Sequence, residues 1–360
     1  MATVQALEQI RDRILAAAAG RAPLRIRGGG TKDFYGQSLH GEVLDVCAWR
    51  GIVAYEPTEL VITARGGTPL AEVQAALAER GQMLPFEPPV FGIGATIGGV
   101  VAAGLSGPRR MAAGAVRDFV LGAALLDGAG RLQHFGGQVM KNVAGYDVSR
   151  LLCGSLGILG VIAEVSLKVL PRPAAEATVA LTVSEADALR HLNAWAGQPL
   201  PISASAWHAS GLRLRFSGAQ AAVRAALARF AHDYGALELA PDVADAYWAD
   251  VRDQRAEFFG GHEPLWRLSL PSTTGPLALP GRQLIEWGGA LRWLKGEVEV
   301  DRLRRMVRDA GGSTTLFRSA ARSADVFEPL APPVLALHRR LKQAFDPAGI
   351  FNPGRMVREL

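Results

Sequence analysis

The segment that decides the fold is residues 24–36, L-R-I-R-G-G-G-T-K-D-F-Y-G. A short strand-like run over residues 24–27 ends in three consecutive glycines, which are followed by Thr31 and Lys32. Because glycine has no Cβ, three in a row allow a turn that exposes successive backbone N–H groups. Such a row of donors suits a phosphate or pyrophosphate. We therefore interpret residues 28–32 as a candidate anion-binding loop, with a plain surface turn as the alternative.

This loop matches neither of two familiar phosphate motifs. Its glycines are spaced neither as G-x-x-x-x-G-K-[ST] nor as G-x-G-x-x-G at the start of a helix. Asp45 stands where the ribose-binding acid of a dinucleotide site could lie, but residues 31–41 contain Gly36 and lack a helical apolar period. The crossover helix of a βαβ unit is therefore not expected. The loop is predicted to join one strand directly to the next.

Composition limits the classes of function. A chain of 360 residues is long enough for two domains with substantial cores. Its 39 basic residues are scattered and are not interleaved with aromatic residues, so we expect no nucleic-acid partner. Two cysteines, Cys47 and Cys153, are too few for a disulfide framework or for the ligands of an iron–sulfur cluster, and they indicate a reducing compartment. Residues 88–108 are uncharged, but their glycines and prolines argue against a transmembrane helix.

The pattern of elements predicts two parts of different character. Before Pro171 we expect helices at 2–19 and, capped by Thr68, at 69–81, with strands at 24–27, 43–46, 51–55, 60–65, 119–126, 131–135 and 161–170. After it we expect strands at 177–183, 202–208, 212–216, 265–270, 283–287, 290–294 and 313–317, with helices at 184–196, 219–234, 243–258 and 300–310. This order suggests an α+β, ferredoxin-like domain. A final helix at 332–345 precedes a turn-rich tail that we expect to fold back on the first domain.

Two further glycine segments accompany the first. Residues 91–107, F-G-I-G-A-T-I-G-G-V-V-A-A-G-L-S-G, are apolar, small and flexible, and residues 154–160 read G-S-L-G-I-L-G. Small side chains permit close approach of another backbone or of a flat ligand. Tight packing of a helix on a sheet is the alternative for residues 91–107.

Three glycine segments followed by a linker and an α+β domain resemble the FAD-binding fold of the vanillyl-alcohol oxidase and p-cresol methylhydroxylase (PCMH) type. That family includes FAD-linked D-lactate and glycolate dehydrogenases. Within it, the chain resembles the E subunits of bacterial glycolate oxidase from about Leu24 to the C-terminus. The most specific segments are K-N-V-A-G-Y-D at 141–147 and E-W-G-G-A-L-R-W-L-K at 286–295, supported by T-I-G-G-V-V-A-A-G-L-S-G-P-R-R at 96–110 and G-I-F-N-P-G-R-M at 349–356.

The resemblance implies a fold of three parts. These are a two-lobed PCMH-type FAD-binding domain at residues 1–172, an α+β, ferredoxin-like cap domain at 173–330, and a helix and tail at 331–360 that return to the FAD domain.

The resemblance also implies where FAD lies. Its pyrophosphate would contact Gly28, Gly29, Gly30 and Thr31. A second wall near the phosphates and the isoalloxazine would consist of Gly94, Thr96, Gly98 and Gly99. The adenosine end would contact Gly154, Ser155, Gly157 and Ile162. Some relatives attach FAD through a histidine of the first loop, but that loop reads Gly30-Thr31-Lys32 here, so we expect non-covalent FAD.

Oxidation of a 2-hydroxy acid requires a cation for the carboxylate and a base for the hydroxyl. Arg267 is the first candidate for the carboxylate, followed by Arg292 and Lys295, and His208 and His262 are candidate bases. Packing roles are the alternative for all of them. The seven histidines are isolated in sequence, so we expect no metal site. Trp287 and Trp293 flank a Gly-Gly turn, where they would close over the flavin, dock a partner or simply pack in the core.

The function implied by the resemblance is that of an FAD-binding subunit in a complex that oxidises glycolate, and D-lactate with it, to the 2-oxo acid. The expected partners are a homologous FAD-containing catalytic subunit, which would hold the main oxidation site, and an iron–sulfur subunit. The expected location is cytoplasmic or peripheral on the inner membrane through the complex. Two alternatives stay open: a self-sufficient FAD-dependent D-2-hydroxyacid dehydrogenase, and a scaffold subunit that has lost FAD.

Overall fold

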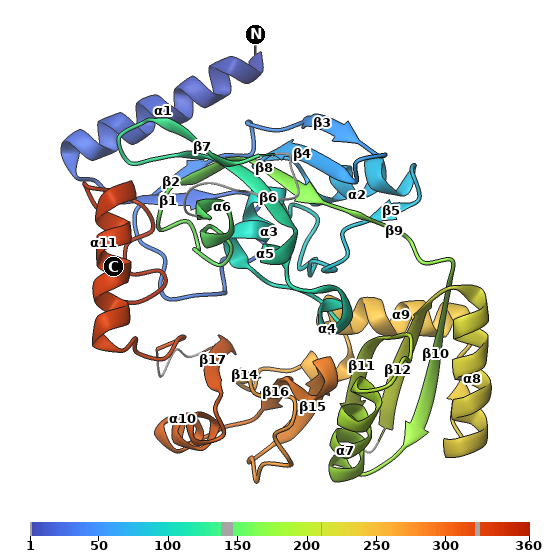
Figure 1. Cartoon of the computed structure of the whole chain (residues 1–360). Helices are drawn as coiled ribbons and strands as arrows, with labels where there is room; N and C mark the ends of the chain where they lie inside the picture. The colour runs from blue at the N-terminus through green and yellow to red at the C-terminus, as the bar shows by residue number, and fades with distance from the viewer. Residues whose placement is uncertain (1, 138–146, 210, 321–324) are drawn as a thin grey trace.

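The computed structural model describes residues 2–137, 147–209, 211–320 and 325–360. It shows an N-terminal lobe, a second lobe below it, and a C-terminal helix that returns to the first lobe (Figure 1). The K-N-V-A-G-Y-D segment, on which part of the family resemblance depends, lies almost entirely outside the described residues. Among the described residues, none of the helices combines the length and the apolar character needed to cross a bilayer.

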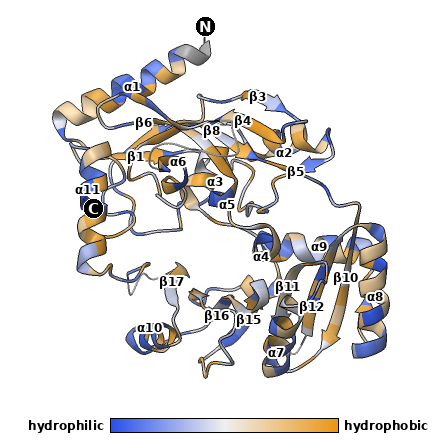
Figure 2. Ribbon diagram, in the orientation of Figure 1, coloured by the Kyte–Doolittle hydropathy of each residue, from blue (hydrophilic) through white to orange (hydrophobic). Residues whose placement is uncertain are grey.

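The N-terminal lobe is built on a five-stranded sheet in the order β3-β4-β8-β6-β7. Its strands are β3 (Ile52–Glu56), β4 (Val61–Arg65), β6 (Val120–Leu126), β7 (Leu132–Gly136) and β8 (Val161–Lys168). Strands β6 and β8 are almost wholly buried and mostly orange in Figure 2, because both faces of the sheet are covered. One face carries α2 (Leu70–Ala78) and α3 (Ile97–Ala103); the other carries α1 (Ala2–Gly20) and the small parallel pair of β1 (Leu24–Arg27) and β2 (Glu42–Asp45). Short elements complete the lobe: β5 (Gln82–Met83), α4 (Arg110–Ala113), α5 (Val116–Phe119), α6 (Val148–Leu151) and β9 (Leu170–Pro171).

The structure confirms that the first glycine loop joins strand to strand, because β1 and β2 pair directly in parallel register. The predicted helix cap at Thr68 is wrong. Helix α2 begins at Leu70, with Pro69 as its N-cap residue. The Thr68 hydroxyl instead accepts from the Gly51 N–H at 2.9 Å and donates to the Gly51 carbonyl at 3.1 Å. This bond ties the start of α2 to the neighbouring strand rather than to the helix itself.

The second lobe is one antiparallel sheet that contains eight strands among the described residues, in the order β13-β10-β12-β11-β15-β16-β14-β17. Its strands are β10 (Ala175–Thr182), β11 (Ile202–His208), β12 (Gly211–Gly218), β13 (Leu237–Glu238), β14 (Leu265–Ser269), β15 (Arg282–Glu286), β16 (Leu291–Lys295) and β17 (Ser313–Arg318). The first four strands follow the ferredoxin-like order, with α7 (Glu185–Ala196) and α8 (Gln220–Tyr234) as the two crossovers. The last four repeat that strand order with α10 (Val300–Asp309) as their α-helix, and the two halves meet where β11 pairs with β15. The predicted ferredoxin-like pattern is therefore present twice within one sheet.

Helix α9 (Pro241–Arg252) is shorter than expected from sequence. It covers the opposite face of the sheet from α7 and α8, with the Trp248 indole donating to the Thr178 hydroxyl at 2.9 Å. The helix stops at Arg252 because Gln254 adopts a left-handed backbone, with a φ of 56°. A short 3₁₀ turn, η1 (Glu257–Phe259), then leads to β14.

The C-terminal segment returns to the first lobe, as predicted. After α11 (Pro332–Phe345), the Leu24 N–H donates to the carbonyl of Ile350 at 2.7 Å, and the Asn352 N–H donates to the carbonyl of Leu24 at 2.8 Å. Phe351 is fully buried beside β1. The tail thus lies along the strand that leads into the first glycine loop.

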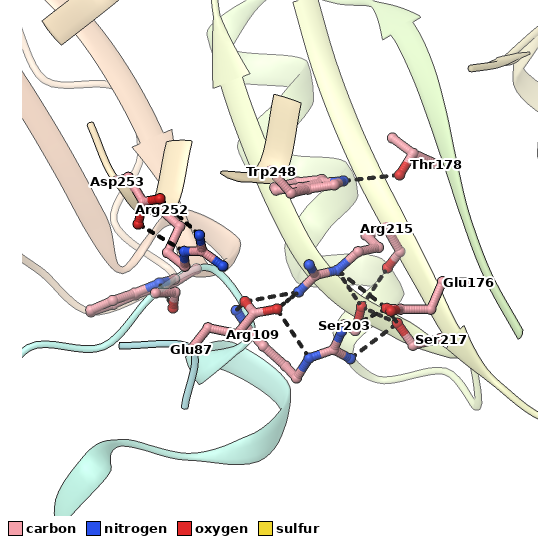
Figure 3. A network of polar contacts seen from close by, with 12 residues as sticks. Glu87, Arg109, Glu176, Thr178, Ser203, Arg215, Ser217, Trp248, Arg252 and Asp253 are labelled. Carbon is pink, nitrogen blue, oxygen red and sulfur yellow. Dashed lines mark hydrogen bonds and ion pairs between the residues drawn. The ribbon is translucent and has the colours of Figure 1, made fainter. Parts of the chain in front are cut away.

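A buried polar network joins the two lobes (Figure 3). Glu87 and Arg109 come from the first lobe, and Glu176 and Arg215 come from β10 and β12. Arg109 Nη2 lies 2.6 Å from Glu176 Oε1, and Arg215 Nη2 lies 2.9 Å from Glu87 Oε1. Burial opposes the charge of Glu87, but Arg215 and Arg109 outweigh it and hold the pKa of this carboxyl below its ordinary value. The lobes are therefore connected by charges that are costly to separate.

Candidate functional site

The three glycine segments meet at one cavity of about 100 Å³ in the first lobe. It is lined by Gly28, Gly29, Gly30, Thr31, Lys32, Asp33, Tyr35, Leu39, Thr96, Gly99, Ala102, Ala103, Leu156 and Arg355. The first segment supplies four of the residues predicted to hold the FAD pyrophosphate, and the second supplies two of those predicted for the opposite wall. The third segment contributes Leu156. The structure thus brings the three glycine segments to one cavity, and FAD binding there stays a prediction.

Glycine is required where the first two segments touch. A Cβ on Gly29 would lie 1.5 Å from the carbonyl oxygen of Gly94, and a Cβ on Gly28 would lie 2.3 Å from the hydroxyl of Thr96. Real Cβ atoms do not approach other atoms this closely, so any side chain would push the two loops apart. The close approach of these backbones forms the wall of the cavity.

The amides of the first loop are available to a ligand. Within the described parts of the chain, the backbone N–H groups of Gly28, Gly29, Gly30 and Thr31 donate to no protein acceptor. A row of donors without a protein acceptor at the edge of a cavity can bind an anion, which would accept from several of them at once. The donor set fits a pyrophosphate, the group predicted for this loop.

The other predicted cofactor residues do not line this cavity. Gly98 packs on β4, where a Cβ would meet the carbonyl of Gly66 at 2.8 Å, so helix–sheet packing accounts for it. Gly154 and Gly157 adopt positive φ angles of 81° and 75°, which shape the turn around Leu156. Ser155 and Ile162 are buried. A role for these residues at the adenosine end stays a prediction.

Two residues of the C-terminal tail hold the glycine loops, and sequence reasoning assigned them no role. The Asn352 side chain accepts from the Ile26 N–H at 2.7 Å and donates to the Leu156 carbonyl at 2.6 Å. The buried Arg355 guanidinium donates to the carbonyls of Asp33, at 2.9 Å, and of Tyr35 and Gln37. The G-I-F-N-P-G-R-M segment carried the only available signal for them, through the family resemblance.

A second, smaller cavity of about 20 Å³ lies between the lobes and contains Arg267. The first lobe contributes Pro89, Phe91, Leu105, Ser106, Gly107 and Pro108, and the second contributes Val251, Arg252, Gln254, Arg267, Glu286, Leu291, Trp293 and Phe317. The Arg267 guanidinium lies 5.4 Å from the Trp287 ring centre and, within the described residues, has no carboxylate partner within 4.0 Å. It is therefore available to a ligand carboxylate.

Glu286 is the residue of this cavity that sequence reasoning missed. Its side chain is 3% exposed, and its Oε1 accepts from the Trp293 indole at 2.7 Å. Burial raises the pKa of Glu286 to about 7, although the Trp293 hydrogen bond and the charge of Arg267 act in the opposite direction. Only the pairing of β14, β15 and β16 brings Glu286 and Arg267 to one face of the sheet.

Lys32 approaches the same region from the glycine loop. Its ammonium lies 5.7 Å from the Phe91 ring centre, and burial lowers its pKa to about 8, with Asp253 of the other lobe acting against this shift. Sequence reasoning expected Lys32 to add a charge at the pyrophosphate. The structure places it between the glycine loop and the second lobe, where it lines the first cavity.

The other candidate catalytic residues lie elsewhere. Arg292 is fully buried and donates to the carbonyls of Gly275 and Thr274, and Lys295 Nζ lies 3.6 Å from Glu263. His208 Nδ1 is 2.7 Å from the Gln283 carbonyl, and His262 is exposed. Neither histidine lines the cavity that contains Arg267. The structure therefore gives no support to His208 or His262 as the base.

The two tryptophans of the Gly-Gly turn are buried between the lobes. Trp287 donates to the Gly107 carbonyl at 3.1 Å, and both rings pack in one cluster with Tyr35 and Phe317. No group of three or more His, Cys, Asp or Glu residues that could hold a metal ion occurs in residues 2–137, 147–209, 211–320 and 325–360.

Comparison with known proteins agrees with this geometry. Residues 1–136 match the family described as FAD binding domain, and residues 323–356 match FAD linked oxidases, C-terminal domain. The chain is 48% identical to glycolate oxidase subunit GlcE of Escherichia coli (strain K12) over 98% of its own length and 97% of that protein's. It is 31% identical to glycolate oxidase subunit GlcD of Bacillus subtilis (strain 168) over 47% of this chain and 36% of that one. Among solved structures, alkyldihydroxyacetonephosphate synthase shares the fold, with a TM-score of 0.66 at 15% identity, over 96% of this chain and 75% of that one.

The fold, the paired glycine loops and the two domain matches define an FAD-linked oxidoreductase with an FAD-binding domain and a C-terminal oxidase domain. Similarity to GlcE extends over nearly the whole of both chains, whereas similarity to GlcD covers about half of this one. The chain belongs to the family of glycolate oxidase subunits GlcE. The predicted family and α+β fold class are thereby confirmed.

Proposed function

We propose that this chain binds FAD without a covalent link, in the cavity between residues 28–32 and 94–99, and serves a complex that oxidises glycolate and D-lactate. The observation that carries the proposal is the row of unpaired amides at Gly28, Gly29, Gly30 and Thr31 among the described residues, facing a wall from which side chains are excluded. A pyrophosphate would accept from these amides. The absence of histidine from the loop favours non-covalent binding.

The proposed partners are a homologous FAD-containing subunit of the GlcD type and an iron–sulfur subunit. The relatives GlcE and GlcD are both subunits of glycolate oxidases. The two cysteines of this chain cannot supply the four thiolates of a cluster, so onward electron transfer requires another protein or a quinone. We place the complex in the cytoplasm or peripherally on the inner membrane, with its main oxidation site in the sister subunit.

A second candidate function is oxidation of a 2-hydroxy acid by this chain itself. The unpaired Arg267 guanidinium in the interlobe cavity favours it, because a small acid needs such a cation for its carboxylate. When bound, FAD supplies the acceptor for the hydride that leaves the substrate carbon. The chain's own residues would bind the acid and exclude water, since the cavity is lined by Phe91, Trp293 and Phe317.

A visible absorption spectrum tests both candidates and the scaffold alternative. The chain is purified alone, and its spectrum is recorded before and after anaerobic addition of glycolate. Flavin bands that persist support an FAD-binding subunit that needs partners for turnover, and bands that bleach support oxidation by this chain. Folded protein without flavin, both alone and in the co-expressed complex, would refute FAD binding and leave the scaffold role.

A further inference from the structure

We propose that Glu286 accepts the hydroxyl proton of a small 2-hydroxy acid whose carboxylate binds Arg267 in the interlobe cavity. This inference rests on the second candidate function above and assigns that site its base. In the step, the substrate O–H bond breaks and its proton moves to the Glu286 carboxylate. The C–H bonding pair would leave as hydride, for which bound FAD would be the acceptor, and the C–O bond would become the carbonyl of the 2-oxo acid.

Strand register places the two residues on one face of the sheet. Arg267 of β14 lies opposite Trp293 of β16, which lies opposite Leu284 of β15. Because side chains alternate along a strand, Glu286 points to the same side as Leu284. That side faces the first lobe, since both Glu286 and Arg267 line the cavity together with Gly107 and Pro108.

The carboxylate of Glu286 is oriented by a hydrogen bond to one of its two oxygens. Trp293 donates to Oε1, whereas Oε2 has no hydrogen-bond partner within the described residues. Arg267, although it lines the same cavity, is not within 4.0 Å of Glu286 in an ion pair. The free oxygen and the free guanidinium leave one acceptor and one cation for a ligand.

The size of the cavity suits the proposed contact. A volume of about 20 Å³ has room for a hydroxyl group or a single water beside the carboxylate, but not for a long side chain. The walls from Leu291 and Phe317 are apolar, so water is largely excluded and the proton has few other acceptors. An acid whose carboxylate also reaches Arg267 needs more room than this, so its binding requires the side chains that line the cavity to move apart.

The groups that face Glu286 set its proton affinity. Burial raises the pKa of Glu286 to about 7; the Trp293 hydrogen bond and Arg267 lower it, and Glu87 of the interlobe network raises it. The Glu286 charge in turn contributes to the raised pKa of Tyr247 on α9. Arg252 also lines the cavity, and its guanidinium forms an ion pair with Asp253. A base that titrates near neutral pH is suited to accept and then release a proton.

The test uses the FAD-loaded chain, in its complex if FAD requires it, with Glu286→Gln compared against Glu263→Gln. Glu263 is an exposed glutamate of the same lobe that pairs with Arg282 and Lys295 and does not line the interlobe cavity. We expect Glu286→Gln to slow flavin reduction by glycolate by about 10²- to 10⁴-fold and to abolish its rise with pH around neutrality. Glu263→Gln should match the wild type. Retention of both rate and pH profile by Glu286→Gln would overturn the proposal.

A binding measurement separates this inference from the function on which it rests. Oxalate, which cannot be oxidised to a 2-oxo acid, is titrated calorimetrically in two buffers of different ionisation enthalpy. An anion beside Glu286 raises its proton affinity, so the wild type should take up protons on binding and Glu286→Gln should not. If glycolate does not reduce the flavin but this difference is found, the turnover proposal fails and the placement of Glu286 stands. Equal proton uptake by both proteins would refute that placement.

A second variant keeps the proposal testable if Glu286→Gln does not fold. Trp293→Phe removes the indole donor, which raises the pKa of Glu286 and should move the pH profile of flavin reduction to higher pH. A purely structural role for Trp293 would lower the rate without moving the profile, and that result would contradict the proposed base.

Discussion

The Asn352 side chain accepts a hydrogen bond from the backbone N–H of Ile26 at 2.7 Å, across 326 residues of sequence. Ile26 lies in β1, two residues before the first glycine of the proposed pyrophosphate loop. The same amide group donates to the Leu156 carbonyl in the third glycine segment. One side chain from the C-terminal tail thus fixes two loops of the FAD-binding lobe.

Replacement of Asn352 by Ala should destabilise the fold and weaken retention of FAD. Two hydrogen bonds to partly buried backbone groups are lost, so the free energy of unfolding should fall by about 1–3 kcal/mol. Urea unfolding and the ratio of flavin to protein after gel filtration measure the two effects. Asn193→Ala, which removes side-chain bonds to the carbonyls of Leu189 and Ser272 in the other lobe, should lower stability and leave flavin retention unchanged. Equal flavin content in both variants would contradict the role of the tail.

Replacement of Gly29 by Val should abolish flavin retention. Its Cβ would lie 1.5 Å from the Gly94 carbonyl oxygen, so the loops must separate and the amide row must move. The measurement is the absorbance of bound flavin in purified protein whose circular dichroism shows it to be folded. Gly275→Ala is the matched control, because a Cβ there meets nothing within 4 Å. Full flavin content in Gly29→Val would refute the placement of the pyrophosphate.

Replacement of Arg109 by Met should destabilise the joined lobes by about 3 kcal/mol at neutral pH, because Glu87, which is largely buried, and the more exposed Glu176 both lose a partner. The folded-state pKa of Glu87 is lower than its unfolded value of 4.5, so its contribution to stability is present above that pH and is lost as the pH falls through the folded value. The difference in the free energy of unfolding between the wild type and Arg109→Met should therefore become smaller at acidic pH. Urea unfolding at a series of pH values measures it. Arg190→Met removes an exposed pair with Asp187 and should change stability by less than about 1 kcal/mol. A pH-independent difference for Arg109→Met would show that the charge of Glu87 is not involved.

Replacement of Lys32 by Met should have opposite effects on stability and on cofactor binding. Burial lowers the Lys32 pKa from 10.5 to about 8, so the ammonium is unfavourable in the folded protein without FAD, and the variant should be more stable at pH 7. Between about pH 8 and 10.5 the unfolded chain binds more protons than the folded one, so the wild type gains stability with rising pH and the advantage of the variant disappears. Retention of FAD, an anion, should be weaker in Lys32→Met.

Thermal unfolding of the apoprotein across pH, together with flavin content, checks both effects of Lys32→Met. Lys168→Met alters a lysine of β8 that does not line the cavity, so it should neither raise stability at pH 7 nor weaken the retention of FAD. A variant that is less stable at pH 7 would contradict the desolvation argument.

Much of the fold could be predicted because its signals are local. The three glycines after residues 24–27 predicted the strand–loop–strand arrangement, and the Ser184–Asp187 spacing predicted the start of α7, where the Ser184 hydroxyl accepts from the Asp187 N–H at 3.1 Å. The cap at Thr68 was predicted wrongly because a local pattern cannot show that the hydroxyl is used by Gly51 on a neighbouring strand. For the same reason the sequence did not indicate that the ferredoxin-like order occurs twice in one continuous sheet.

By itself, the sequence determined which residues must be small and where the chain must turn, since these depend on the φ angle and Cβ of single residues. It therefore predicted that residues 28–31, together with Thr96 and Gly99, belong to one cofactor site, and the structure brings them to one cavity. Only the tertiary structure decided which distant side chains complete the sites. Asn352 reaches β1 across 326 residues, and Glu286 shares a face with Arg267 only through the pairing of β14, β15 and β16. Such contacts depend on strand order and lobe packing, which no local pattern of residues encodes.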